Sequence, residues 1–271
     1  MLGKLIKNEF KSSAHSVLNI YLAAAITIVV MLLSYFAKIS WISTISTVAL
    51  LIISGIAILI TLVAVISGFY KSLYGSQGYL SFTLPVKSGQ LLASKAIVSF
   101  AWILMSYVIA IAIWIGVYFY AAARIGQDRI TTIKTLLQLF EGVPSERAIK
   151  QLLIFLCVLI FAQIAVFIAE VYFAITLANT KTFQKIGMVS AIFIFFAVFI
   201  VMQIFIGVLT SYVPITLTVA GDGLALSFAQ AMVDYTGGIS LGVTGFIFQI
   251  FAAAALFVAT AYLMKNKVNV K

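Results

Sequence analysis

Charged residues are scarce in this chain of 271 residues: they make up 9% of it, against 64% hydrophobic residues. A water-soluble domain covers itself with roughly 25% charged residues, so the composition excludes an ordinary soluble fold. It predicts instead a multi-pass membrane protein whose outer surface is solvated by membrane lipid. The net charge is +10, and the lysines and arginines lie in short stretches between apolar runs. Such spacing indicates membrane-topology signals, and we expect no nucleic-acid partner.

Cysteine and histidine are nearly absent, with one residue of each. The single Cys157 excludes an intrachain disulfide framework and a multi-cysteine zinc site, and its apolar neighbours predict a small buried hydrophobe. The single His15 excludes an H-E-x-x-H metal site and argues against a serine, histidine and acid triad. No G-x-x-x-x-G-K-[ST] phosphate loop is present. We therefore expect no catalytic residue, no metal site and no cofactor in this chain, which is not predicted to be an enzyme.

Six apolar runs are long enough to cross about 30 Å of hydrocarbon as helices, which takes about 20 residues. They cover residues 17–36, 45–69, 96–120, 152–177, 188–209 and 241–263. The first run is expected to be a permanent span, because it is longer than the apolar stretch of about 7–15 residues in a signal peptide. No internal repeat divides the chain. The predicted fold class is an all-α polytopic membrane protein with a single transmembrane domain over residues 1–271.

Lysine and arginine predict the orientation of these spans. Six spans put both termini on one side, and placing that side in the cytoplasm gives it eleven of the seventeen basic residues. Five of the seven acidic residues then lie outside. We therefore expect both termini in the cytoplasm, together with the polar segment "YGSQGYLSFTLPVKSGQLLASK" (residues 74–95) between the second and third runs.

The N-terminal stretch has apolar residues at near-helical spacing (Leu2, Leu5, Ile6 and Phe10) with lysines around them. This pattern predicts a short amphipathic helix lying in the inner membrane interface. A solvated basic start that only sets topology is the alternative.

Two segments between the spans are expected to lie outside. In the first, Asp128 is placed as a helix N-cap ahead of an apolar stripe, and Gly142 and Pro144 end the helix. The stripe consists of Ile130, Ile133, Leu136, Leu137 and Phe140. The second, residues 210–238, lacks lysine and arginine and suits two short re-entrant or surface helices, with an ordinary loop as the alternative.

One acidic residue, Glu170, lies within a span, and Gln163 precedes it by seven residues on the same helical face. A buried carboxyl must be protonated, hydrogen-bonded or close to water, so Glu170 is a candidate for lining a cavity or fixing helix packing. The alternatives are a carboxylate hydrated near the inner headgroups or paired with Lys181. Gln203 and Gln249 are expected to be interhelical hydrogen-bond partners.

Two stretches carry a family resemblance. The N-terminal "MLGKLIKNEF" and the run "GFYKSLYGSQGYLSFTLPVKSGQLLASK" resemble bacterial permeases of the ABC transporter type-2 class, the Firmicutes-type membrane subunits above all. The specific part is the element Gly-Tyr-Leu-x-Phe-Thr-Leu-Pro-Val followed by "LLASK". It is matched at Gly78, Tyr79, Leu80, Phe82, Thr83, Leu84, Pro85 and Val86.

The resemblance implies a six-span permease in the bacterial cytoplasmic membrane that works with a second permease and two separate ABC ATPase subunits. ATP and Mg²⁺ would bind to those ATPases. The segment after the second span would be the cytoplasmic coupling helix, with anchors at Tyr74, Gly78, Tyr79, Leu80, Phe82, Leu84 and Pro85. Relatives of this kind export peptides, lipids or drugs, so the expected cargo is an amphipathic peptide or another hydrophobic molecule. A membrane scaffold or sensor that recruits a cytoplasmic partner without transport is the alternative.

Overall fold

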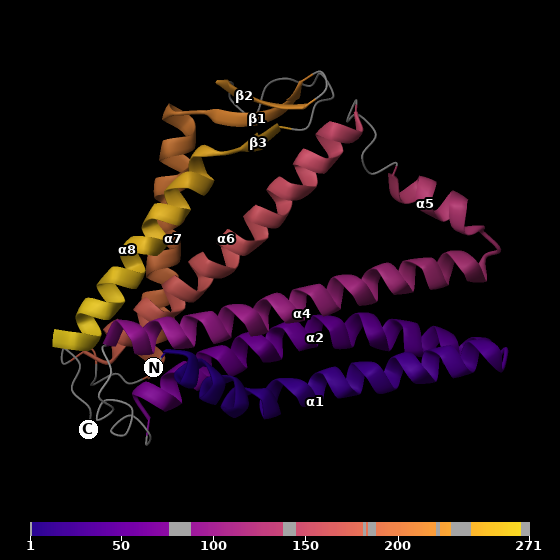
Figure 1. Cartoon of the computed structure of the whole chain (residues 1–271), viewed down its shortest axis with the longest axis horizontal. Helices are drawn as coiled ribbons and strands as arrows, with labels where there is room; N and C mark the ends of the chain where they lie inside the picture. The colour runs from indigo at the N-terminus through magenta and orange to yellow at the C-terminus, as the bar shows by residue number, and fades with distance from the viewer. Residues whose placement is uncertain are drawn as a thin grey trace. The chain divides into compact units, whose positions relative to one another are not determined.

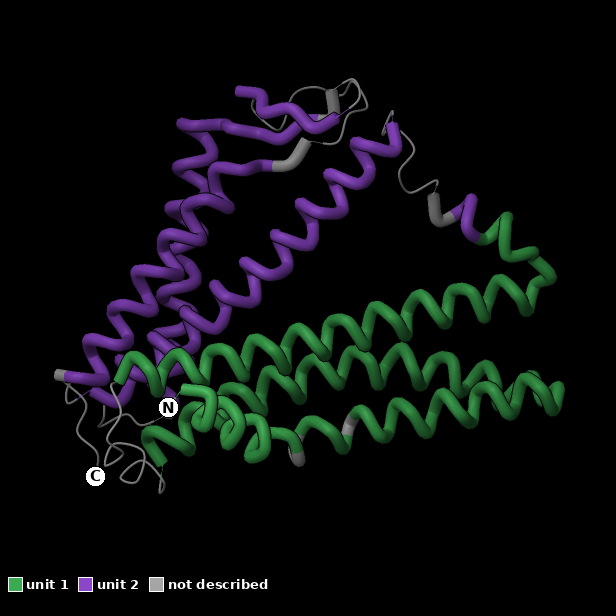
Figure 2. The backbone as a smooth tube through the Cα atoms, in the orientation of Figure 1, with its two compact units in different colours: residues 1–132, 270–271 green, residues 133–269 purple. Residues whose placement is uncertain are grey.

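The structure is a computed structural model that describes residues 2–75, 88–137, 145–180, 183, 188–220, 223–228 and 240–266. Most of these residues are helical, and the chain divides into two compact units. Residues 1–132 with 270–271 form unit 1, and residues 133–269 form unit 2 (Figure 2).

Six helices are long and apolar enough to cross a membrane (Figure 1). They are α1 (Leu2–Phe36), α2 (Ser40–Leu73), α4 (Ser88–Arg124), α6 (Glu146–Ala178), α7 (Met188–Tyr212) and α8 (Thr244–Asn266). Each contains the core of one predicted span, so the prediction of a mostly helical chain with six candidate spans is confirmed. Large apolar side chains are exposed on all six helices, as expected of helices surrounded by hydrocarbon.

In unit 1, α1 and α4 pack on one face of α2, and this face carries mainly small side chains. Its buried residues recur every three or four positions: Ser43, Ser46, Leu50, Ser54, Ala57, Thr61, Val65, Phe69 and Leu73. This is the spacing of one helix face. Small residues on that face let the backbones of α1 and α4 approach closely, which drives helix association where all surfaces are equally apolar.

Residues 2–16 belong to α1 and continue directly into the first candidate span. Ile6, Phe10 and Ala14 pack against a buried cluster of Val17, Val98 and Trp102. Lys4, Lys7 and Lys11 are exposed. The amphipathic pattern of the N-terminal stretch thus separates a protein-packed face from a basic face.

Unit 2 packs α6 against both α7 and α8. Val166, Ala169 and Ala253 form a buried cluster between α6 and α8. The rings of Phe205 and Phe248 stack between α7 and α8 with their centroids 6.0 Å apart. Cys157 of α6 is exposed, so the expectation of a buried cysteine was wrong: its helix face is apolar but is not covered by protein.

A three-stranded antiparallel sheet in unit 2 corrects the all-α prediction. Its strands are β1 (Ile215–Ala220), β2 (Gly223–Phe228) and β3 (Ser240–Gly242), in the order β2-β1-β3. The expected surface helices for residues 210–238 were therefore wrong over 215–220 and 223–228. The sequence Ile-Thr-Leu-Thr-Val is rich in β-branched residues and alternates apolar residues with threonine, which favours a strand. In the register of the first two strands, Ala220 pairs with Gly223.

The short helix α5 (Arg129–Leu137) begins where the sequence predicts it. The backbone N–H of Thr131 donates to Oδ1 of Asp128 over 3.3 Å, which confirms Asp128 as the N-cap. Ile130 and Ile133 of the expected stripe are exposed. Phe140, Gly142 and Pro144 lie outside the described residues. Hydrogen bonds from Thr131 lower the pKa of the Asp128 carboxyl below its usual value.

Removing this cap should loosen the start of α5. We expect Asp128→Ala to raise the hydrogen-exchange rate of the Thr131 amide several-fold at neutral pH, while Asp128→Asn keeps the capping oxygen and the slow exchange. Because the folded pKa is depressed, the carboxylate stabilises α5 at neutral pH. That contribution fades as the pH falls below about 4. Equal exchange in the wild-type and alanine chains at neutral pH would contradict the assignment.

Candidate functional site

The predicted coupling segment lies between the end of α2 and the start of α4, and both of these helix ends are described. Of its proposed anchors, Tyr74 is resolved as the residue that ends α2. Gly78, Tyr79, Leu80, Phe82, Leu84 and Pro85 lie outside the described residues. The structure therefore describes the base of the segment, which we call the junction and define by residues 6–13, 69–75 and 88–102.

The end of α2 is held firmly in unit 1. Phe69 and Leu73 are buried, and the N–H of Tyr74 donates to the carbonyl of Tyr70 over 2.8 Å. The Tyr74 ring contacts the rings of Phe69 and Tyr70, with centroids 6.2 and 6.5 Å apart. Tyr74 thus closes α2 with an aromatic cluster at the point where the predicted coupling segment begins.

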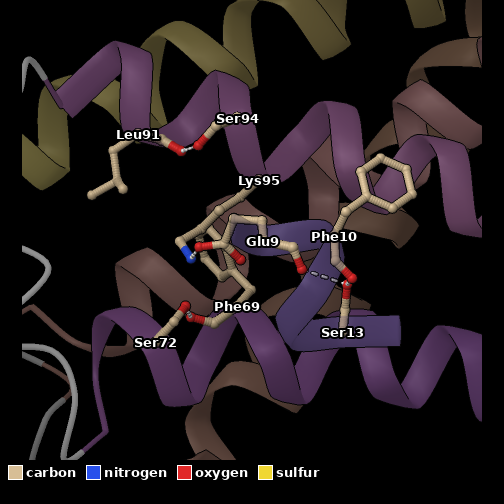
Figure 3. A network of polar contacts seen from close by, with 8 residues as sticks. All are labelled: Glu9, Phe10, Ser13, Phe69, Ser72, Leu91, Ser94 and Lys95. Atoms are coloured by element: carbon tan, nitrogen blue, oxygen red, sulfur yellow. Dashed lines mark hydrogen bonds and ion pairs between the residues drawn. The ribbon is translucent and has the colours of Figure 1, made fainter. Parts of the chain in front are cut away.

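The start of α4 carries an ion pair that the sequence analysis missed (Figure 3). The Nζ atom of Lys95 lies 2.5 Å from Oε1 of Glu9, and its side chain is only 3% exposed. Leu91, Leu92 and Ser94 around it are also buried. A buried ammonium is tolerated only beside a counter-charge, so Lys95 fixes the N-terminal part of α1 against the first turns of α4.

A second contact, one turn further along α1 and two turns further along α4, reinforces the ion pair. The indole Nε1 of Trp102 donates to Oγ of Ser13 over 2.8 Å, and that hydroxyl donates to the carbonyl of Glu9 over 2.7 Å. The Phe10 and Trp102 rings lie 5.3 Å apart. Glu9 is therefore held through its side chain by Lys95 and through its backbone by Ser13.

A chain of hydroxyl groups ties all three helices of unit 1 together further from the junction. The hydroxyl of Tyr21 is 2.5 Å from Oγ of Ser106, which is 2.7 Å from Oγ1 of Thr61. These side chains come from α1, α4 and α2 in turn. A displacement of the start of α4 would therefore reach α1 through at least two sets of polar contacts. A displacement of α2 would reach α1 through the Thr61–Ser106–Tyr21 chain.

The sequence did contain a signal for the ion pair. Glu9 is the only acidic residue before Asp128, and it stands among several lysines. Lys95 sits seven residues inside a long helix that is otherwise uncharged up to Arg124. Both residues were counted only as topology signals. Each needs a counter-charge once α1 packs on α4, and this requirement was overlooked.

In unit 2 the predicted intramembrane polar residues separate into different environments. Nε2 of Gln163 donates to Oε1 of Gln249 over 2.7 Å, which confirms Gln249 as an interhelical partner between α6 and α8. Gln203 is exposed on α7 and has no hydrogen bond within the described residues, so its predicted interhelical role is not supported. Gln163 and Glu170 are not brought together, since Gln163 is exposed and Glu170 is buried.

Glu170 lies in the buried C-terminal part of α6 and is only 5% exposed. Its neighbours on the helix, Ala169 and Tyr172, are fully buried. Within the described part of the chain no donor reaches its carboxylate. This burial contradicts the alternative of a hydrated carboxylate, while Lys181, the other suggested partner, lies outside the described residues.

No family model, curated protein or solved structure matches the chain. The interpretation of the site therefore depends on its own geometry and on the resemblance of residues 78–86.

Breaking the ion pair from one side should destabilise unit 1 more than removing both charges. Lys95→Met leaves Glu9 unpaired and Glu9→Gln leaves a buried ammonium, so each should lower the free energy of unfolding by about 3 kcal/mol. The double variant Glu9→Leu/Lys95→Met, and the reversed pair Glu9→Lys/Lys95→Glu, should recover most of this loss. Denaturant titration of the detergent-solubilised chain measures these values.

The exposed Lys71, in the last turn of α2, provides a matched control. Lys71→Met should leave the free energy of unfolding within about 0.5 kcal/mol of wild type. A Lys95→Met chain as stable as Lys71→Met would show that Lys95 and Glu9 do not depend on each other.

The Gln163–Gln249 hydrogen bond should contribute little but measurably to the packing of α6 on α8. A double-mutant cycle with Gln163→Leu and Gln249→Leu should give a coupling of about 0.6 kcal/mol, the average for polar pairs between membrane helices. The cycle that combines Gln163→Leu with Gln203→Leu should give none. Equal couplings in the two cycles would contradict the pairing.

Proposed function

We propose that this chain is the membrane-spanning permease subunit of an ATP-driven ABC exporter. The observation that carries the proposal is the element at residues 78–86, which resembles the coupling segment of type-2 permeases. Its position between two candidate spans supports the proposal. So does the junction, which anchors the helix ends on both sides of the segment.

The proposed location is the bacterial cytoplasmic membrane, with both termini and residues 74–95 in the cytoplasm. The bias of basic residues supports this orientation. The exposed Lys4, Lys7 and Lys11 suit a position at the inner interface, where they reach anionic headgroups. In this arrangement the N-terminal part of α1 lies along the interface and its apolar face rests on Val98 and Trp102.

In the proposed mechanism a separate ATPase binds ATP and Mg²⁺ and contacts residues 76–87. Tyr79, Leu80 and Phe82 are the anchors of that interface, since aromatic side chains dominate binding energies at such surfaces. A push on the segment reaches α2 through Tyr74 and α4 through Leu91 and Leu92. The Glu9–Lys95 pair then transmits the displacement of α4 to α1, so that the three helices of unit 1 respond together.

The proposed cargo is an amphipathic peptide or another hydrophobic molecule, and the working complex holds a second permease, either another copy or a related chain. The spans that would enclose the cargo are apolar, and α7 in particular carries the exposed Phe193, Phe196 and Phe199. Such surfaces suit an apolar cargo better than an ionic one.

The test is capture of the ATPase by the tagged chain from gently solubilised membranes of its own host. The wild-type chain should retain a protein with a phosphate loop and an ATPase activity that the cargo stimulates. Tyr79→Asp and Leu80→Asp should each lower the retained ATPase roughly tenfold or more, the usual effect of removing an interface anchor. Tyr212→Asp is the control, because Tyr212 is 83% exposed and is the last residue of α7, which the proposed orientation places outside.

Two results would overturn the proposal. One is labelling of position 79 in a Tyr79→Cys chain by an impermeant reagent added outside the cell. The other is capture of a cytoplasmic partner that hydrolyses no nucleotide, which would favour a scaffold or sensor.

A further inference from the structure

A groove in unit 1 lies between α1 and α4, away from the junction. It encloses about 500 Å³, with Leu50 of α2 at its floor. The lining is almost entirely apolar. On its rim, Ala25, Ala112 and Gly116 are exposed, whereas Leu50 is buried. The groove therefore opens onto the surface of the candidate spans.

Small side chains create this hollow. Ala25 of α1 faces the groove from one side, and Ala112 and Gly116 of α4 face it from the other. These residues are too small to fill the space between the two helices. A Cβ atom added at Gly116 would meet nothing within 4 Å. Apolar interiors of proteins are close-packed, so an open apolar groove of this size requires a filling that comes from outside unit 1.

The length of the groove matches one leaflet of a bilayer. It extends along α1 from Tyr21 to Leu32. Eleven residues of helix cover roughly 16 Å. The hydrocarbon core is about 30 Å thick, so the groove is about as long as a single acyl chain in one leaflet.

The two ends of the groove differ in polarity. At one end the Tyr21 hydroxyl is already bonded to Ser106. At the other end the Tyr120 hydroxyl is buried and has no hydrogen-bond partner within the described residues. An occupant with an oxygen acceptor at that end would supply the bond that the phenol lacks.

Positive charge marks the same end. Arg124 follows Tyr120 by one helical turn on the same face of α4. Its Nη1 donates to Oγ1 of Thr44 over 3.0 Å, which holds the guanidinium at the end of the unit. The turn between α1 and α2 lies at this end of unit 1, beside the C-terminal end of α4 (Figure 1). It carries the exposed Lys38. A guanidinium here is suited to a phosphate group.

We propose that this groove holds one acyl chain of a phospholipid, with the glycerol ester end at Tyr120 and the phosphate on Arg124. The apolar lining, the length of one leaflet and the cationic mouth together identify a lipid rather than a protein segment as the occupant. With both termini in the cytoplasm, this lipid belongs to the outer leaflet. The inference rests on the membrane location in the proposed function, and is independent of the ATPase.

The test uses the full chain reconstituted alone in vesicles of phosphatidylglycerol that contain a trace of the same lipid with a photoreactive diazirine in its acyl chain. After illumination, labelled residues are mapped by mass spectrometry. In the wild-type chain, labelling should concentrate on the groove-facing residues of 21–32 and 109–120. Gly116→Leu should lower that labelling roughly tenfold or more, because the leucine takes the place of the chain.

Gly207→Leu is the matched control, since Gly207 lies on α7 in equally open surroundings. It should leave groove labelling unchanged. Ala112→Leu serves as a second occluding variant if Gly116→Leu does not assemble. Arg124→Gln should lower labelling by the phospholipid several-fold, yet leave labelling by a diazirine-bearing long-chain alcohol unchanged, because the alcohol carries no phosphate.

Several outcomes would overturn the inference. One is labelling of the groove residues that is no stronger, for their exposure, than labelling of the outer face of α7. It would show that the groove contacts only the lipid that surrounds the whole chain. Efficient disulfide cross-linking of two copies through Gly116→Cys would mean that a second copy covers the groove. If no helix is labelled by any probe, the membrane location itself fails, whereas labelling of α7 and α8 without the groove refutes only the lipid site.

Discussion

Backbone polar groups have no partner in hydrocarbon except each other, and the remainder of this fold follows from that constraint. A chain with 9% charged residues has little material for a water-facing surface, so its apolar runs form helices that satisfy their own N–H and C=O groups. The strands that the structure describes lie between α7 and α8, in a segment whose sequence is less apolar than that of the spans. Secondary structure here therefore depends first on the medium and only then on local propensity.

Polar side chains connect helices at a few places within each unit. In unit 1 these contacts include the Glu9–Lys95 pair, the Trp102–Ser13 bond and the hydroxyl chain from Tyr21 to Thr61. In unit 2 the Gln163–Gln249 bond does the same. Each contact pairs polar groups whose burial without a partner would cost free energy. Each therefore specifies the register of its helices and adds a modest stability. An apolar surface alone would allow the helices to slide.

The spans and the Asp128 cap were predictable because length, hydropathy and capping chemistry are local properties of the sequence. The ion pair was not, since Glu9 and Lys95 are 86 positions apart and their contact depends on how α1 packs on α4. The sheet was missed because mild polarity without charge was taken for surface helix, although Thr216 and Thr218 alternate with apolar residues. Cys157 shows the same limit, because hydropathy cannot distinguish a side chain facing protein from one facing lipid.

The small sheet has a mechanical consequence for the helices that it joins. Strand β1 follows α7 within three residues, and only Val243 separates β3 from α8. The side chain of Gln151 on α6 accepts the N–H of Leu224 in β2 over 2.8 Å. The sheet thus joins α7 to α8 through hydrogen bonds between backbones, with Val243 bonded to Ile215, and it holds α6 through one side-chain bond. Rotation of α7 against α8 would strain the hydrogen bonds between β1 and β3, so the sheet resists such a rotation at this end of unit 2.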